Sequence, residues 1–390
     1  MSQSSISYLW REPDAAKSFS TGVSLHSHTN QSQETLDFIS ELSKNWGMLQ
    51  PLMRWCESRC RRLSGIQPDY AHSYWTPPLT PSLAFDLERS QIEDRLQMPG
   101  LVSITDHDDI QAPLLLRSVP SSRHIPVSVE WTVPFGQTAF HLGIHNLPSV
   151  SGAEWMNRLK EFTAIPVETR KPSQLTEMLA ELDELPGVLI VFNHPIWDLY
   201  RIGNDRHNVL VNEFLAVNGQ FIHALELNGL RDWKENREVS TLAGKWNQLV
   251  ISGGDRHGIE PNANVNLTRA GSFTEFVHEV RRDRESHVLF MPQYAEPWKH
   301  RILQSTLAAI RDYPHFPEGS RRWDERVYHP DSSGAIRPLS SLWITGHAPV
   351  YIRSILNAVR LMGSAPLSNG LRMAWNDTGE MRAALARLDS

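Results

Sequence analysis

Short runs of apolar and β-branched residues recur along the chain, and longer segments with helical periodicity lie between them. The expected strands are Gly22–Leu25, Leu101–Thr105, Ile125–Val129, Phe140–Ile144, Val188–Phe192, Ala224–Leu227 and Leu249–Ser252. The expected helices are Glu34–Lys44, Ser82–Gln97, Ala153–Phe162, Ser173–Leu182, Val209–Val217, Asp232–Trp246 and Phe273–Arg284. Strands that alternate with helices are typical of βα units, so the pattern predicts an α/β fold with a mostly parallel sheet or barrel.

This alternation is interrupted twice. The first two strands are separated by far more chain than a crossover helix needs, and this stretch holds a basic helix candidate, Met53–Leu63, and the Pro-rich segment YWTPPLTPS. After residue 288 the strand pattern gives way to a helical tail rich in Pro, Trp and Arg. We therefore predict a barrel domain over residues 20–288, a helical insertion within it at residues 38–99, and a helical C-terminal extension at residues 289–390.

The composition is that of a soluble globular protein. With 390 residues, 40% hydrophobic and 21% charged, the chain can bury a large core, which excludes wholesale disorder. A net charge of −6 argues against bulk nucleic-acid binding, and no apolar run approaches the ~20 residues of a membrane span. The sequence shows no secretory signal and only two cysteines, Cys56 and Cys60, so we expect a cytoplasmic protein.

Histidine or acidic residues follow nearly every expected strand. They are His26 and His28; Asp106, His107, Asp108 and Asp109; Glu130; His141 and His145; His194; Glu226; and Asp255 and His257. Each motif alone has a simpler explanation, such as a helix N-cap for the Asp-His-Asp-Asp run. In a parallel barrel, however, all strand ends meet on one face. Residues two apart in a strand also point the same way, so each His-x-His or Asp-x-His pair can reach one ion. This many convergent nitrogen and oxygen donors fit Zn²⁺, Mn²⁺ or Fe²⁺, and more than one ion.

The motifs LHSHT, ITDHD, SVEWT, HLGIH, FNHP, LELNG and GGDRH resemble, in order and spacing, the signature motifs of the PHP (polymerase and histidinol phosphatase) superfamily. The resemblance covers roughly His26 to Arg284, apart from the insertion. It implies a distorted seven-stranded, TIM-like (β/α) barrel with a metal centre at the strand C-termini, and hydrolysis of phosphate esters. It also implies two or three divalent ions, manganese, iron or zinc, and no other cofactor.

The resemblance also assigns ligands. It implies that His26, His28, Glu130 and Asp255 hold one ion, that Glu130 bridges to a second ion held by His141 and His194, and that His107 and His257 take a third. One position departs from the family pattern. Gln33, in HTNQSQETL, stands where the family has a further ligand of the third ion, and a neutral amide is a poor ligand. We therefore expect two firmly held ions and a weak or empty third site.

Several residues are candidates for the chemistry itself. The family mechanism implies a hydroxide that bridges the ions and attacks the phosphate, with Glu130 as the bridging carboxylate. His257 is the first candidate to protonate the leaving group if the third site is empty, and Asp106 or Asp108 come next. Asp106 can instead orient a ligand imidazole, as Glu226 and Asn228 are expected to brace the site, and His145 either caps a turn or replaces His141.

Three arginines are candidate contacts for a substrate phosphate. Arg256 either clamps a phosphate oxygen or points away and pairs with a carboxylate, and both readings stay open. Arg201 and Arg206, in the loop after the His194 strand, either contact phosphate or are solvated. Among the aromatic residues of the insertion, Tyr70, Tyr74 and Trp75 can stack on a substrate, but anchoring the insertion's own core is the preferred reading.

The leading hypothesis is a metal-dependent phosphoesterase that hydrolyses monoesters or diesters of a small phosphorylated metabolite or nucleotide. Its expected partner is that small substrate, with no bulk nucleic acid and no membrane; the oligomeric state is left open. One alternative is a metal-dependent amide or lactone hydrolase, since the same ions activate water against a carbonyl. Another is a non-catalytic metal-binding module in which Gln33 marks decay, although the retention of every other ligand argues against it.

Overall fold

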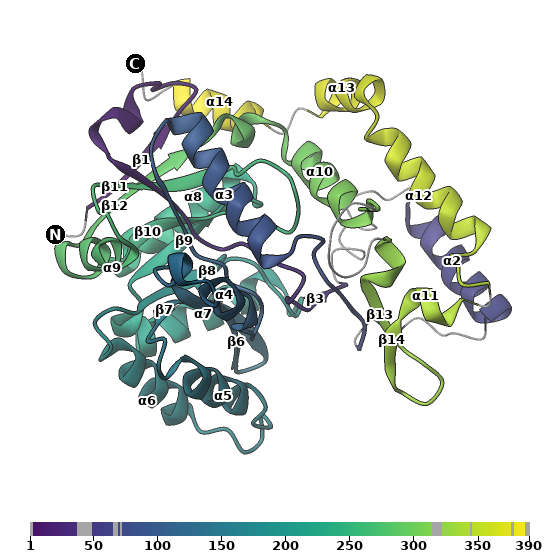
Figure 1. Cartoon of the computed structure of the whole chain (residues 1–390), viewed down its shortest axis with the longest axis horizontal. Coiled ribbons are helices and arrows are strands. Elements are labelled where there is room, and N and C mark those ends of the chain that lie inside the picture. The colour runs from purple at the N-terminus through teal and green to yellow at the C-terminus, as the bar shows by residue number, and fades with distance from the viewer. Residues whose placement is uncertain are drawn as a thin grey trace.

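The computed structural model describes the chain except for residues 1–2, 37–48, 65–68, 71, 314–321, 344, 376–377 and 387–390. Three separate sheets and surrounding helices form a mixed α/β fold (Figure 1). The first sheet has the order β1 (Gln3–Tyr8), β12 (Glu285–Phe290), β11 (Asn264–Thr268), β2 (Thr21–Ser24) and β5 (Gly100–Val102). The second has the order β10 (Leu249–Gly253), β9 (Ala224–Asn228), β8 (Leu189–Asn193), β7 (Thr138–Leu147) and β6 (Val127–Phe135).

All seven strands expected from the sequence are present, as β2 and β5 to β10, but the sheets are less parallel than expected. Strand β6 turns directly into β7 through Gly136 and Gln137, and β7 pairs antiparallel with β8 as well. The turn is tight because Gly136 has a φ of 57°, which a glycine adopts without strain. Strand β11, which had not been expected, is antiparallel to both β12 and β2.

Two single bridges join the sheets at the C-terminal ends of their strands. Ser27 pairs with Arg256 beyond β2 and β10, and His107 pairs with Glu130 between the end of β5 and β6. Over the described residues the ladders otherwise remain in separate sheets, so the closed seven-stranded barrel is not confirmed. These bridges nevertheless place the residues that follow β2, β5 and β10 beside β6.

Helices cover the outer faces of the two large sheets. They are α3 (Pro81–Leu96), α4 (Gln111–Arg117), α5 (Gly152–Thr163), α6 (Pro172–Asp183), α7 (Asn204–Asn218), α8 (Trp233–Trp246) and α9 (Phe273–His278). Short helical turns are Ala15–Ser18, Pro120–Ser122, Gly219–Phe221, Glu279–Asp283, Pro292–Ala295 and Trp323–Glu325. The largest core cluster lies between the second sheet and its helices and includes the fully buried Trp131, Phe192 and Phe214. Its apolar side chains hold the strands, and hence their polar ends, in place.

A third sheet joins the two segments that had been expected to be helical additions. Its order is β14 (Ile336–Pro338), β13 (Val327–Pro330), β4 (Tyr74–Trp75) and β3 (Glu34–Thr35). Glu34 therefore lies in a strand, which corrects the expected helix Glu34–Lys44; most of that segment falls outside the described residues. The predicted boundary at residue 288 also falls within β12, which belongs to the first sheet.

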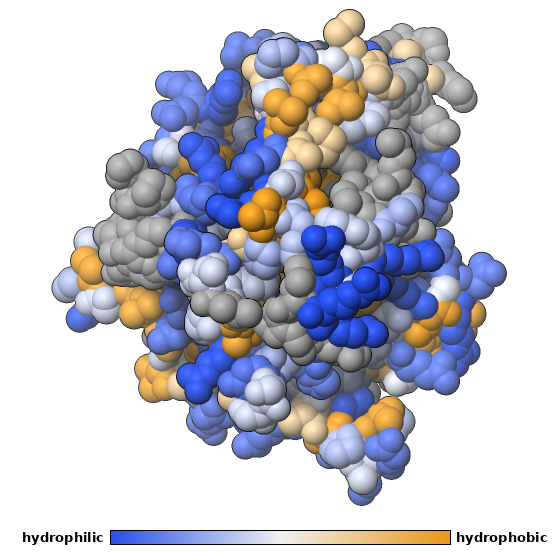
Figure 2. Space-filling view, turned by 90° about the vertical axis from the view of Figure 1, so that its right-hand side faces the viewer, coloured by the Kyte–Doolittle hydropathy of each residue, from blue (hydrophilic) through white to orange (hydrophobic). Residues whose placement is uncertain are grey.

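The C-terminal extension is otherwise helical, with α10 (Trp298–Ile310), α11 (Leu339–Leu342), α12 (Val350–Met362), α13 (Ala365–Ala374) and α14 (Gly379–Ala386). Helix α2 (Leu49–Ser64) of the insertion lies beside α12, where Trp55 meets Tyr351 edge to face (Figure 1). On the face that lies at the right of Figure 1, scattered hydrophobic patches interrupt a mostly hydrophilic surface (Figure 2). Within the described part of the chain, every helix is too short or too polar to cross a membrane.

Candidate metal centre

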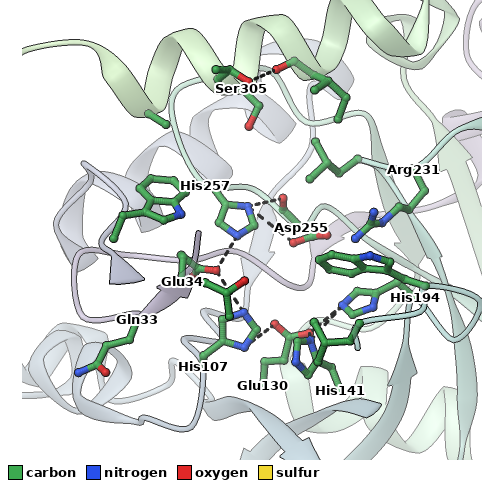
Figure 3. Close-up of a pocket in the computed structure, with 18 of the residues that line it drawn as sticks. Gln33, Glu34, His107, Glu130, His141, His194, Arg231, Asp255, His257 and Ser305 are labelled. Carbon is green, nitrogen blue, oxygen red and sulfur yellow. Dashed lines mark hydrogen bonds and ion pairs between the residues drawn. The ribbon is translucent and has the colours of Figure 1, made fainter. Parts of the chain in front are cut away.

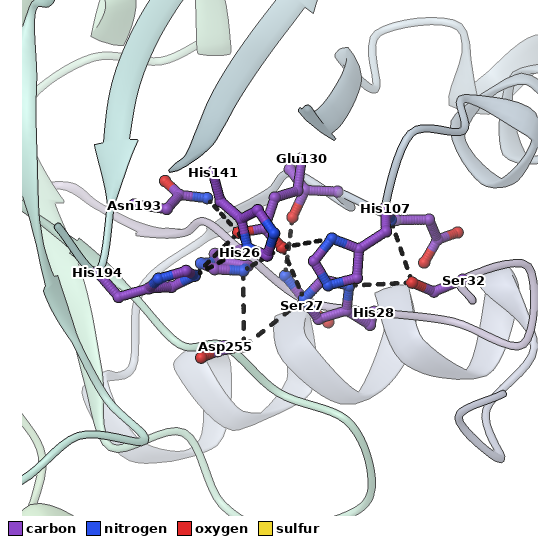
Figure 4. A network of polar contacts seen from close by, with 12 residues as sticks. His26, Ser27, His28, Ser32, His107, Glu130, His141, Asn193, His194 and Asp255 are labelled. Atoms are coloured by element: carbon purple, nitrogen blue, oxygen red, sulfur yellow. Dashed lines mark hydrogen bonds and ion pairs between the residues drawn. The ribbon is translucent and has the colours of Figure 1, made fainter. Parts of the chain in front are cut away.

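The polar residues that follow the strands converge on one buried cluster (Figure 4). His26 and His28 follow β2, His107 follows β5, His194 follows β8, and Asp255 and His257 follow β10, while Glu130 and His141 lie within β6 and β7. All are buried except His107 and His257, which are partly buried. The structure thus brings together the eight residues that the sequence had nominated as metal ligands, although it leaves their ligand roles as predictions.

Glu130 lies at the middle of the cluster, and its two carboxylate oxygens face different imidazoles. Oε1 lies 3.1 Å from His194 Nε2 and 3.3 Å from His141 Nδ1. Oε2 lies 3.0 Å from His26 Nε2, 3.4 Å from His28 Nε2 and 3.3 Å from His107 Nδ1. A carboxylate with one oxygen toward each set of imidazoles is arranged as a bridge between two ion sites.

A second carboxylate, Asp255, closes the group around the two histidines of β2. Its Oδ1 lies 3.6 Å from His26 Nε2 and 3.6 Å from His28 Nε2. The other oxygen, Oδ2, accepts a hydrogen bond from Asn228 Nδ2 at 3.0 Å. Asn228 therefore sets the orientation of Asp255, which supports the bracing role expected for it.

Glu34 supplies a third carboxylate that the sequence reasoning missed. Its Oε2 lies 3.2 Å from His107 Nε2 and 3.1 Å from His257 Nε2, and its Oε1 lies 3.3 Å from His28 Nδ1. Gln33 precedes Glu34 in the chain and had been aligned with a ligand position of the family. Its side chain is exposed. The weak or empty third site stays a prediction, but the neutral amide of Gln33 no longer supports it, because the Glu34 carboxylate faces His107 and His257.

The residue pattern gave only a partial signal for Glu34. It stands one position beyond the aligned glutamine, in HTNQSQETL, and had been assigned to a helix. Strand β3 instead turns the side chain inward, and the Ser32 hydroxyl donates to Glu34 Oε1 at 2.5 Å. The same Ser32 oxygen accepts the His107 N–H at 3.1 Å, which ties this loop to the end of β5.

The donor set fits divalent cations. Four overlapping groups have ligand atoms within 4.8 Å of one another: His26, Glu130 and His194; His26, His28 and Asp255; His28, Glu34 and His257; and His28, His107 and Glu130. Within the described chain, the buried atoms His28 Nε2 and His107 Nδ1 have no hydrogen-bond partner. Buried polar atoms are rarely left unpaired, and imidazole nitrogens aimed at carboxylate oxygens are the ligands that Zn²⁺, Mn²⁺ and Fe²⁺ accept.

Glu226 holds His26 in its orientation. His26 Nδ1–H donates to Glu226 Oε1 at 2.5 Å, which leaves Nε2 directed at Glu130 and Asp255. Oε2 of Glu226 accepts the His194 N–H at 2.8 Å and Asn228 Nδ2 at 3.0 Å. A β-carbon on Gly253 would overlap the Glu226 carboxylate, so a glycine is required beneath it. A carboxylate behind a ligand histidine fixes its tautomer and raises its basicity, so Glu226 is a positioning residue for the cluster.

The charges of the cluster compensate one another. Burial acts to raise the pKa of Glu34, Glu130 and Asp255, but the surrounding imidazoles lower it well below the usual range. Burial opposes protonation of His107 and His257 as well, yet Glu34 and its neighbouring carboxylates raise their pKa to about 10 and about 9. Burial lowers the pKa of His28 to about 4. Protonated His107 and His257 thus balance part of the negative charge of the three carboxylates.

Three of the converging residues have a left-handed backbone. His26, His194 and Asp255 have φ values of 65°, 27° and 51°. Residues other than glycine seldom adopt this conformation, which costs on the order of 1–3 kcal/mol each and is retained chiefly at functional sites. Each of the three stands within two residues after a strand, where the local turn redirects the side chain into the cluster.

Asp106, Asp108 and His145 lie outside the four ligand groups. The Asp106 carboxylate accepts the Thr29 N–H at 2.5 Å and the Thr29 hydroxyl at 2.7 Å, and burial raises its pKa to about 7. It therefore holds the loop that follows His28. His145 Nδ1 and the Ser103 hydroxyl are hydrogen-bonded at 2.8 Å, and burial lowers the pKa of His145 to about 3. Asp108 accepts the Thr132 N–H at 2.8 Å and lines the cavity, and burial raises its pKa.

The three arginines nominated as phosphate contacts lie elsewhere. Arg256 is buried and pairs with Glu88 Oε1 at 2.9 Å and with Gln91 Oε1 at 3.0 Å, both on α3. Of its two readings, the structure therefore shows the one in which it points away. Arg201 and Arg206 are exposed and lie outside the described lining of the cavity. The cations that do line it are Arg231 and Lys299.

The cavity above the cluster has a volume of about 350 Å³ (Figure 3). Arg231 lies 3.6 Å from the centre of the Trp197 ring and is buried. Its Nε has no hydrogen-bond partner within the described residues, and its ion pair with Glu235 Oε1 is long, at 3.8 Å. Arg231, in LELNGLRDW, follows the Glu226 motif and had not been predicted as a site residue.

No family model matches the chain, and a search of curated proteins finds no match. Similar solved structures include an amidohydrolase from Chromobacterium violaceum, with 16% identity, a TM-score of 0.31, and coverage of 47% of this chain and 84% of that chain. PsfC from Pseudomonas syringae PB-5123 has 12% identity and a TM-score of 0.40 over 74% of this chain and 96% of that chain. A proposed metal-dependent phosphoesterase from Bifidobacterium adolescentis has 14% identity and a TM-score of 0.29 over 54% and 92%. Likenesses of this size indicate nothing about substrate, and membership of the PHP superfamily stays a prediction.

Proposed function

We propose that this protein is a metal-dependent hydrolase of phosphate esters of a small molecule, with a PHP-type centre of two or three divalent ions. The observation that carries the proposal is the position of Glu130, whose two oxygens each face a different set of imidazoles within 3.4 Å. A single ion would be contacted by one of these oxygens and would leave the imidazoles that face the other oxygen without an ion.

The residues divide naturally among the ions. His26, His28, Asp255 and Glu130 would hold one, and Glu130, His141 and His194 would hold the second. The third would take Glu34, His107 and His257. Divalent ions at such a site polarise a phosphoryl oxygen and make hydroxide available at neutral pH.

The chain's own residues supply the other requirements of the reaction. Arg231 is a buried cation at the cavity wall with an unsatisfied Nε, so it can hold a phosphate oxygen in the role that had been predicted for Arg256. Asp108 lines the cavity and burial raises its pKa, so it is the candidate to transfer a proton to the leaving group. His257 is less suited to this, because its nitrogens face Glu34 and the Asp255 carbonyl.

The first experiment is metal content per chain together with phosphate release, for the wild type, Glu130→Gln, and Glu177→Gln as a matched control on the exposed face of α6. The wild type and the control should hold two or more equivalents of manganese, iron or zinc and release phosphate from aryl esters. Glu130→Gln should lose metal and slow phosphate release by at least about a thousandfold, since a bridging ligand serves both ions.

Two outcomes would count against the proposal. A folded wild type that binds neither Mn²⁺ nor Zn²⁺ would remove the metal centre and favour a different role for the cluster. A metal-loaded protein that releases no phosphate but hydrolyses an amide or a lactone would keep the centre and change the reaction.

A further inference from the structure

The cavity wall that faces the metal ligands belongs to the C-terminal extension. One face of α10 contributes Trp298, Lys299, Ile302, Ser305, Thr306 and Ala309. Most of these are spaced three or four residues apart, so a single helix face covers the cavity (Figure 3). Nothing in the motifs around the ligands requires this helix.

Helix α10 is fixed firmly to the loop that carries Arg231. Trp298 Nε1 donates to the Leu230 carbonyl at 3.0 Å, and Arg301 donates to the Arg231 carbonyl at 2.8 Å and to the Gly229 carbonyl. The wall is therefore part of the folded site, with its side chains held in one arrangement.

The lining of the cavity as a whole is largely apolar, although Lys299, Ser305 and Thr306 of α10 also line it. Trp298 and Ile302 of α10 are partly exposed, and they face a lining that includes Trp197, Leu199 and Leu230 from the loops after β8 and β9. Of the polar members of α10, Thr306 already donates its hydroxyl to the Ile302 carbonyl at 2.8 Å. The ligand cluster forms the charged end of the cavity, and Arg231 lies in the loop that is hydrogen-bonded to α10.

Trp75 completes the apolar end from the insertion. It is buried, its ring lies 5.9 Å from the His257 ring, and it is the partner of Glu34 in the β3–β4 ladder and of Val327 in the β4–β13 ladder. The same ladder therefore places a ligand carboxylate and an aromatic wall residue. A cavity of about 350 Å³ with flat indole rings favours a compact, planar apolar group.

We propose that this apolar wall of α10 and Trp75 selects substrates in which the anionic group is attached to a compact aryl group. The proposal rests on the proposed function and names its substrate class. A polyhydroxylated group such as a sugar would lose its water without gaining enough hydrogen-bond partners there, which is costly. An aryl group gains from burial against indole and aliphatic surface.

Binding of two phosphonates to the Mn²⁺-loaded protein tests the wall without requiring turnover. Phenylphosphonate and methylphosphonate carry the same anionic group, and calorimetry gives both dissociation constants. The wild type should bind phenylphosphonate at least about tenfold more tightly, since a buried methylene is already worth about fourfold. Ile302→Asn should reduce this preference about fivefold and leave methylphosphonate binding unchanged.

Two further variants keep the test decisive. Gln304 lies on α10 outside the cavity lining and accepts a hydrogen bond from Gln293. The variant Gln304→Ala should therefore retain the full preference for phenylphosphonate. If Ile302→Asn fails to fold, Ile302→Val, which keeps an apolar side chain, should reduce the preference about twofold to fourfold through the loss of one methylene.

The failures of the two proposals are distinguishable. Equal binding of the two phosphonates, with phosphate released from both phenyl phosphate and glycerol phosphate, would overturn the apolar wall and leave the proposed function standing. A preference for phenylphosphonate without hydrolysis of any phosphate ester would overturn the function and support the wall. Binding of neither phosphonate, together with no phosphate release from either ester, would overturn both.

Discussion

Replacing Glu34 by Gln tests the third carboxylate of the cluster, which lies one residue beyond the position that the family pattern aligns with a ligand. Glu34 faces His28, His107 and His257 at 3.1–3.3 Å, while Gln33 is exposed. Gln33→Ala is therefore a matched control one residue away. We expect Glu34→Gln to lose one equivalent of metal while the Glu130-centred pair remains, and Gln33→Ala to keep all of them.

The size of the effect follows from the contacts. Residues that only support a metal ligand typically change affinity by about 10–100-fold, so the loss of a directly bound anion should weaken the third ion by at least about 100-fold, or ~2.7 kcal/mol. In the metal-free protein the substitution also leaves protonated imidazoles without their buried partner, which costs about 3–5 kcal/mol of unfolding free energy.

The pH dependence of this second effect has a definite sign. Burial opposes protonation of His107 and His257. Glu34 and neighbouring carboxylates nevertheless raise the pKa of His107 to about 10 and of His257 to about 9 in the metal-free protein. Groups with raised pKa stabilise the fold fully below their unfolded pKa of about 6.5, and this contribution disappears as pH rises through the folded values. The stability gap between wild type and Glu34→Gln should therefore be widest near pH 6 and shrink above pH 9. Denaturant titrations of chelator-treated protein at several pH values measure it.

The assays for Glu34→Gln are metal content by mass spectrometry after dialysis and competition with a chelating dye. A full complement of metal in Glu34→Gln, together with metal loss in Gln33→Ala, would refute the assignment and restore the prediction from the family pattern. An equal loss in both variants would mean that the loop conformation, rather than the carboxylate, controls the third site.

Three further outcomes are expected. Glu226→Gln should weaken metal binding about 10–100-fold with the fold retained, because the proton on His26 Nδ1 loses its charged acceptor; an unchanged chelator competition curve would contradict this. Arg231→Ala should raise the KM for phosphate esters about 10–100-fold at unchanged metal content, with partial rescue in Arg231→Lys, whereas a change in kcat alone would argue against a phosphate contact. Metal loading near pH 7 should release about three protons, from His26, His107 and His257, and apparent affinity should rise between about pH 6 and 9; calorimetry in buffers of different ionisation enthalpy detects this, and no buffer dependence would count against it.

The sequence was sufficient to locate the clustered residues that follow the strands because the local pattern there carries two signals at once. A buried apolar run predicts the strand, and the His or acidic residue that follows it predicts the chemistry. This logic identified His26, His28, Glu130, Asp255 and His257, and the structure brings all five into one cluster. It works because strand ends converge whatever the exact order of the strands.

The parts that the sequence did not predict depend on pairings between distant segments. Glu34 lies in a two-residue strand, and its pairing partner Trp75 is forty-one positions later in the chain. Local periodicity therefore does not predict this strand. The Arg256 side chain points away from the cluster because it pairs with the buried carboxylate of Glu88 in α3. The sequence alone could not show that this carboxylate lies within reach of Arg256. The turn at Gly136 and Gln137 differs from these cases because it did have a local signal. Its glycine indicates a hairpin between β6 and β7, whereas these strands had been expected to belong to a mostly parallel sheet.

The third sheet explains why the insertion and the C-terminal extension matter to the same site. Strand β4 pairs with β3 on one side and with β13 on the other, so Trp75 stands opposite both Glu34 and Val327. A ligand of the cluster and a wall of the cavity thus share one hydrogen-bonded ladder, and α10 is tied in turn to the Arg231 loop. The ligands that follow the strands are set by the large sheets, whereas the carboxylate of Glu34 and the apolar wall depend on segments outside them. Changes in the extension should therefore alter substrate preference first and leave the Glu130-centred residues in place.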